Sequence, residues 1–197
     1  MPGVMRLTFS DRAVLAIILF FCMAGCRAVP APSNFNSDLT VTQTQKTPFR
    51  VSIVPTRSAS DSRVITIASE KPDEFYVVLT NISNEPHPVW ETWNSWGSRT
   101  ISFEFQFGNN PPILVARGPE DFTRNFPSTF LIPPGEHKVY PVRLDKWWDV
   151  RSVPKSTETL VSVKAIYQVP NTPEAVEYHV WTGRVESGSY EFTLRQW

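Results

Sequence analysis

The sequence predicts an all-β protein, an antiparallel β-sandwich, and three observations point to that fold class. Apolar and polar residues alternate with period two along several short stretches, which is typical of strands with one buried face. The chain holds 18 prolines, so a long helix would be interrupted almost anywhere, and no window shows a convincing amphipathic helical pattern. Turn-forming sequences such as Pro133-Pro134-Gly135-Glu136 separate the alternating stretches.

Eight to ten short strands are expected. The clearest begins at Ile101, where apolar residues up to Phe107 alternate with Ser102, Glu104 and Gln106. Two more alternating stretches lie at 161–168 and 190–194. The remaining predicted strands have the apolar and β-branched composition that strands favour, and they cover residues 49–54, 64–68, 75–80, 113–116, 130–132, 138–144 and 178–185.

The N-terminus predicts export. The first twelve residues carry the positive charges of Arg6 and Arg12, and the apolar run AVLAIILFF follows at 13–21. Small residues then lead up to Gly25. This three-part pattern is that of a signal peptide, assigned here to residues 1–25. The apolar run is too short to cross a bilayer, which needs about 20 residues.

The sequence Met23-Ala24-Gly25-Cys26 resembles the bacterial lipobox, although Met23 stands where leucine is preferred. The resemblance implies that Cys26 carries fatty acids such as palmitate and becomes the new N-terminus. The alternative is an ordinary cleavage site that leaves a free thiol. The other cysteine, Cys22, would leave with the signal, so the mature chain would have no disulfide and would depend on its core for stability.

The remaining chain is organised as a tether and one domain. Residues 26–45 are rich in Ala, Pro, Ser, Asn, Thr and Gln and predict a flexible tether. Residues 46–197 form one domain, long enough to bury roughly 70% of its unfolded surface. Without residues 1–25 the chain keeps 17 basic residues (19 − 2) and 18 acidic ones (19 − 1) with no basic block, which argues against a nucleic-acid partner.

Three later stretches resemble bacterial immunoglobulin-like β-sandwich domains. They are EFYVVLTNISNEPHPVWETWNSWGSRTISFEF, LIPPGEHKVYPV and VWTGRVESGSYEFTL. As a whole, residues 46–197 look like an uncharacterised family of bacterial exported lipoproteins with one such domain. A fainter similarity, confined to the first stretch, runs to the intracellular proteinase inhibitor of bacilli. These resemblances imply an architecture and no reaction, because a fold does not determine function.

Trp90, Trp93 and Trp96 recur at intervals of three in VWETWNSWG. If the segment is extended, Trp93 faces away from the other two; in a tight turn all three rings point roughly the same way. The neighbouring Asn94, Ser95 and Gly97 favour a turn, and we favour rings that plug one end of the sandwich. The alternative is an exposed binding surface for sugars.

No catalytic or metal-binding motif is recognisable in the sequence. His87 and His137 are expected in turns and His179 in a strand, without a partner at metal-binding spacing. There is no nucleophile elbow, phosphate loop or metalloprotease motif, so we expect a protein that is not an enzyme and uses no cofactor or metal. Of Trp147 and Trp148, one is expected in the core and the other over a loop.

The functional hypothesis is a bacterial cell-envelope lipoprotein, held to the membrane by its lipid on the periplasmic or outer-surface side. Its domain would act without catalysis, as a structural or protein-interaction module for other envelope proteins. Two alternatives remain open. One is a protease inhibitor that presents the loop 108–112 or 117–127; the other is a carbohydrate-binding module that uses the tryptophans on an envelope polysaccharide.

Overall fold

The computed structural model describes residues 47–56, 64–67, 72–155 and 158–196. These residues belong to one compact unit, Thr44–Trp197. The predicted signal peptide, Cys26 and the tether 26–45 lie outside the described residues. No helix in the described ranges is both long and apolar enough to span a bilayer.

The all-β prediction is confirmed. A single short helix, α1 (Pro173–Glu177), accompanies the strands among the described residues. The strands are β1 (Phe49–Pro55), β2 (Val64–Ile67), β3 (Glu74–Asn81), β4 (His87–Trp90), β5 (Ile101–Gln106), β6 (Ile113–Ala116), β7 (Thr129–Ile132), β8 (His137–Arg143), β9 (Thr159–Val169), β10 (Gly183–Glu186) and β11 (Tyr190–Gln196).

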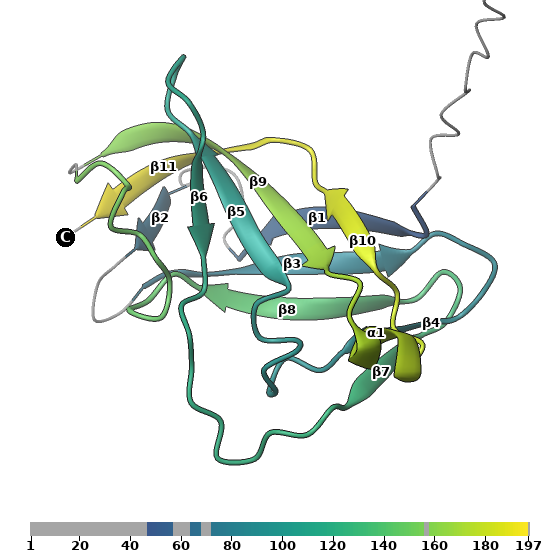
Figure 1. Ribbon diagram of the computed structural model, residues 1–197. Coiled ribbons are helices and arrows are strands. Elements are labelled where there is room, and N and C mark those ends of the chain that lie inside the picture. Colours follow the sequence, from purple (N-terminus) through teal and green to yellow (C-terminus); the bar gives the residue numbers. More distant parts are fainter. Residues whose placement is uncertain (1–46, 57–63, 68–71, 156–157, 197) are drawn as a thin grey trace, which may run out of the picture. The chain divides into compact units, whose positions relative to one another are not determined.

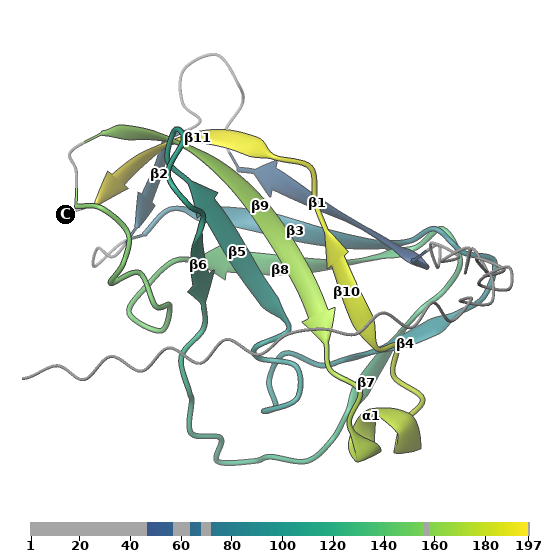
Figure 2. The same ribbon diagram turned by 45° about the horizontal axis from the view of Figure 1, so that its top comes forward.

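The strands form two main sheets, visible as two layers in Figure 1. One sheet has the order β1-β3-β8 and is antiparallel throughout. The other has the order β2-β11-β9-β5-β6, and β10 pairs with the far end of β9. Within the second sheet only β2 runs parallel to its neighbour, β11. A separate two-stranded sheet of β4 and β7 lies beside α1 in both views (Figures 1 and 2).

Aromatic rings from both sheets interlock to form the core. Phe75 of β3 packs against Phe103 of β5 and Phe192 of β11, with ring centroids 5.4 and 5.9 Å apart. Tyr167 of β9 contacts Phe49 of β1 at 6.4 Å. Buried side chains occupy alternate positions of their strands, so the period-two pattern directs them to the face of each sheet that meets the other sheet. The two sheets therefore share one hydrophobic core.

The strand predicted at 178–185 is wrong in its first half. Thr172 caps α1 by accepting a hydrogen bond from the backbone N–H of Ala175, and Pro173 sits in its first turn. His179, expected in a strand, instead has the left-handed φ of 55° in the turn after the helix. Regular strand structure resumes only at Gly183.

Strand β4 is absent from the sequence prediction, which places His87 in a turn. It pairs antiparallel with β7, so that His87 lies opposite Ile132 and Trp90 opposite Thr129. A four-residue strand that contains proline carries little period-two signal, and its partner lies about forty residues further along the chain. This small sheet leads directly into the tryptophan segment.

Candidate functional site

The segment after β4, which we call the tryptophan loop (residues 91–100), is a series of turns organised by Asn94. The Asn94 side chain is fully buried, and its Oδ1 accepts hydrogen bonds from the backbone N–H groups of Trp96 (3.1 Å) and Gly97 (3.0 Å). The backbone N–H of Ser98 donates to the Asn94 carbonyl at 3.0 Å. Asparagine side chains stabilise turns in this way, which is why the segment is not an extended strand.

Gly97 lets the loop close on itself. A Cβ at this position would lie 1.9 Å from the carbonyl oxygen of Glu91 and 2.6 Å from its carbonyl carbon. Both atoms belong to the backbone, so they cannot move aside as a flexible side chain would. Only glycine fits here without a shift of the chain.

The three tryptophans have different surroundings. Trp90 is 2% exposed in the core and packs against Trp96, with ring centroids 6.0 Å apart, and against Tyr178 of the turn after α1. Trp96 is half-buried and packs on the core. Trp93 is 44% exposed. The structure therefore brings Trp90 and Trp96 together and separates Trp93 from them.

Trp93 pairs with a ring from a second loop, which we call the arm (residues 117–128). Phe126 of the arm meets Trp93 edge to face at 4.8 Å, and it is itself 54% exposed. The backbone N–H of Ser95 donates to Asn125 Oδ1 at 3.0 Å and ties the two loops together. The result is an aromatic pair that joins the two loops and is open to solvent.

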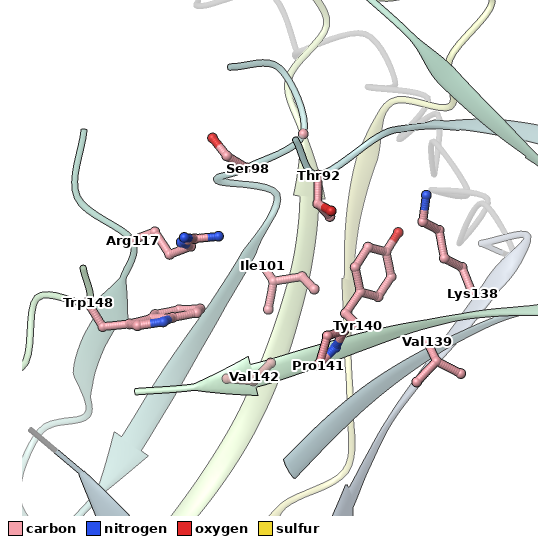
Figure 3. Close-up of a pocket in the computed structure, with 11 residues that line it drawn as sticks. Thr92, Ser98, Ile101, Arg117, Lys138, Val139, Tyr140, Pro141, Val142 and Trp148 are labelled. Carbon is pink, nitrogen blue, oxygen red and sulfur yellow. The ribbon is translucent and has the colours of Figure 1, made fainter. Parts of the chain in front are cut away.

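A hollow of about 250 Å³ lies between the tryptophan loop, the arm and β8, and we call it the arginine pocket. Figure 3 shows Arg117 entering it from one side, with Thr92, Tyr140 and Lys138 on the other. Ile101, Val142 and the ring of Trp148 form its apolar part. The Arg117 guanidinium lies 5.9 Å from the Trp148 ring centroid.

Two buried polar atoms of this pocket, Arg117 Nε and the Tyr140 hydroxyl, have no hydrogen-bond partner among the described residues. The hydroxyl of Tyr167, deeper in the core, has none either. The two tyrosine rings lie 6.2 Å apart, so the two phenol groups are neighbours and influence each other's pKa. Burial, followed by the neighbouring Tyr167 phenol, raises the pKa of Tyr140 well above its ordinary value. The Tyr140 hydroxyl therefore stays neutral even in alkaline solution and remains a hydrogen-bond donor.

Lys138 closes the outer side of the pocket. Its Nζ lies 2.6 Å from Glu91 Oε2 and 4.4 Å from the centre of the Phe130 ring. Both side chains of the ion pair are largely shielded, with 13% of Lys138 and 25% of Glu91 exposed. This ion pair joins the tryptophan loop to β8.

A second hollow, of about 360 Å³, is also lined by residues of the tryptophan loop. Trp90 and Trp96 line it together with Arg99, Gln168 and Thr172. Residues of the tryptophan loop thus line both hollows. Of these two hollows, the second is lined by Trp90 and Trp96, and the arginine pocket is lined by none of the three candidate tryptophans.

The other candidate residues lie apart from these hollows. His87 begins β4 and accepts or donates a 3.0 Å hydrogen bond with Ser83 Oγ, while His137 begins β8. In the described part of the chain, no three His, Cys, Asp or Glu side chains gather in a way that could hold a metal ion. Trp148 is buried, as expected for one member of this pair, and Trp147 is 45% exposed.

Sequence reasoning did not find the arginine pocket, because its residues come from distant segments. Arg117 follows β6, Tyr140 belongs to β8, and Trp148 lies beyond β8, where it forms an isolated antiparallel bridge with Arg117. One signal was available in the alternation of β8, which places Tyr140 on the buried face. A tyrosine at such a position brings a hydroxyl into the interior, where it needs a partner.

Comparison with known proteins adds no family to this description. No protein-family model matches the chain, and no curated protein sequence is found to be similar to it.

Proposed function

We propose that this chain is a bacterial envelope lipoprotein, anchored through Cys26, whose immunoglobulin-like β-sandwich binds another envelope protein without catalysis. The lipid would attach the protein to the membrane, on the periplasmic or outer-surface side. The N-terminal sequence supports the anchor. The strand order and one exposed aromatic pair support the rest.

The strand order supports an immunoglobulin-like fold. In such domains strands A, B and E share one sheet while C, F and G share the other. Here β1-β3-β8 correspond to A-B-E in both chain order and position, and β5, β9 and β11 correspond to C, F and G. The short β4–β7 sheet is an addition to this pattern.

The observation that carries the interaction role is the exposed pair of Trp93 and Phe126. Large aromatic rings that stay about half exposed while held in place are typical anchors of protein interfaces. The chain continues from Phe126 into β7, where Phe130 is 40% and Leu131 is 53% exposed. Loops fixed on a rigid scaffold commonly provide such surfaces. We therefore place the partner surface on the Trp93–Phe126 pair.

The test replaces Phe126 with a photo-crosslinking phenylalanine analogue in the full-length chain, expressed in its native envelope. We expect one discrete crosslinked protein partner that disappears when Trp93→Ala is added. The matched control places the same analogue at Val176, which is 62% exposed on α1. Equal products from both positions, or none from Phe126, would show that the aromatic pair is not an interface.

The lipid anchor has its own test. Metabolic labelling with a tagged fatty acid should mark the wild-type chain and miss the Cys26→Ser variant. Labelling of both chains to the same extent would rule out Cys26 as the attachment site. This result is independent of the crosslinking experiment, so the anchor and the interface can fail separately.

The inhibitor alternative is favoured by one feature of the loop 108–112. All five residues are exposed, and the Gln106 side chain donates to the carbonyl of Gly108 at 2.9 Å and also to that of Asn110. A protruding loop braced from within resembles the rigid loops that proteases bind without cleaving. Inhibition of an envelope protease that is lost in Gln106→Ala and kept in Trp93→Ala would favour this function over the aromatic interface.

A further inference from the structure

We propose that the arginine pocket binds a carboxylate group carried on a short apolar stem. This site is separate from the Trp93–Phe126 surface, because neither of those residues lines the pocket. The proposal for the pocket therefore does not depend on the proposed protein interface.

Two donor atoms of the pocket lack acceptors. Arg117 Nε and the Tyr140 hydroxyl are both buried without a hydrogen-bond partner among the described residues, and the Tyr140 side chain is only 3% exposed. Leaving such groups unsatisfied is energetically costly, so a ligand that accepts from them is favoured. Both groups can donate to the same kind of ligand atom, an oxygen acceptor. Ser98 and Thr92 add two hydroxyls to the rim (Figure 3).

The charges around the pocket favour a single negative charge on the ligand. Arg117 pairs through Nη2 with Glu120, and Lys138 pairs with Glu91, so the two cations are already partly balanced. A doubly charged phosphate would meet both carboxylates at close range. A carboxylate brings one charge and two oxygens, which suit the free donors of a guanidinium.

The apolar part of the pocket favours a hydrocarbon stem. Ile101 and Val142 lie in its floor, and the Trp148 ring forms a side wall below Arg117 (Figure 3). Pockets that combine an apolar lining with a few convergent polar groups are typical of small-ligand sites. The volume of about 250 Å³ suits a small acid or the last residue of a peptide.

An added β-strand is a poorer occupant, although β8 is at the edge of its sheet. Pro141 lies in the middle of β8 and lines the pocket. Proline has no N–H to donate to a new neighbour, and proteins use it to protect sheet edges from further pairing. The pocket is therefore better suited to a small terminal group than to an extended chain.

The first experiment compares ligands on the full-length protein in a mild detergent. Isovalerate is titrated while the indole N–H signal of Trp148 is followed in a ¹H–¹⁵N spectrum, next to isovaleramide and inorganic phosphate. We expect saturable shifts with isovalerate and none with the amide or phosphate. A short peptide that ends in valine, with a free or an amidated C-terminus, then distinguishes a peptide end from a small free acid.

The second experiment uses Tyr140→Phe, with Tyr167→Phe as its matched control. Each change removes one buried hydroxyl that has no partner among the described residues, so neither should lower the thermal midpoint. Of these two tyrosines, Tyr140 lines the pocket and Tyr167 does not. We expect Tyr140→Phe to weaken isovalerate binding about tenfold and Tyr167→Phe to leave it unchanged.

Arg117→Gln should abolish saturable binding, and Arg117→Lys should restore part of it. The backbone around Arg117 is held independently of its side chain, because the N–H of Gly118 donates to the carbonyl of Trp147 and the N–H of Asp149 to that of Ala116. Equal binding of acid and amide, tighter binding of phosphate, or no saturable shift with any carboxylate would overturn the proposal. So would equal loss of binding in the two tyrosine variants.

Discussion

The tryptophan loop and the arm are both irregular segments, yet they relate to the core in opposite ways. The tryptophan loop buries Asn94, Gly97, Ser98 and Thr100, whereas no residue of the arm is buried. The loop supplies its own hydrogen bonds through Asn94, while the arm relies on contacts with its neighbours, including Asn125 with Ser95. A stretch without regular strands can therefore belong to the core, and its tolerance of mutation should follow burial.

The largest effect should come from Trp90→Ala. Trp90 is 2% exposed and contacts both Trp96 and Tyr178, so truncation leaves a large cavity. Such a change costs about 3–5 kcal/mol, a large share of the 5–15 kcal/mol that stabilises a typical domain. The denaturant midpoint measures it, with Trp147→Ala as the exposed control. Equal midpoints for the two variants would place Trp90 outside the core.

Gly97→Ala should follow, with a loss of about 1–3 kcal/mol, because the new Cβ collides with the backbone of Glu91. Gly188→Ala is the matched control, since nothing lies within 4 Å of the Cβ it would add. We expect thermal unfolding to separate the two variants clearly. A Gly97→Ala protein as stable as Gly188→Ala would mean that the loop can open at little cost.

Asn94→Ala and Asn125→Ala compare the two segments directly. Removing the Asn94 side chain leaves two N–H groups of the buried loop without their acceptor, at about 1–3 kcal/mol. Removing that of Asn125 frees one exposed N–H, which water can satisfy. Chemical denaturation should therefore rank Asn94→Ala as the more damaging change. The reverse order would show that the arm holds the loop in place.

The smallest effect on stability should come from Trp93→Ala. Its ring is 44% exposed and contacts Phe126 of the arm, which is itself exposed. Changes at such surface sites usually stay within about 0.5 kcal/mol, although the lost aromatic contact can add a similar amount. Thermal unfolding of the full-length chain checks this. A loss as large as that of Trp90→Ala would make Trp93 part of the plug rather than part of a surface.

Sequence patterns predicted the strands well where the alternation was long. Phe103 and Phe105 in β5 and Val161 and Val163 in β9 are all buried, as period two requires. The prediction failed between Tyr178 and Thr182, where apolar and aromatic residues suggested a strand. There the cap at Thr172 and the proline after it begin a short helix instead. Local capping outweighed β-propensity, which depends strongly on context.

The sequence by itself determined the all-β class of this protein, because burying one face of a strand requires an alternation that can be read locally. It also determined that the tryptophan segment turns, through Asn94 and Gly97. Only the tertiary structure decided that Trp90 is buried while Trp93 stays exposed, and that Arg117, Tyr140 and Trp148 line one pocket. Those outcomes depend on which distant segments pack together, and contacts between residues far apart in the chain leave no periodic pattern in it.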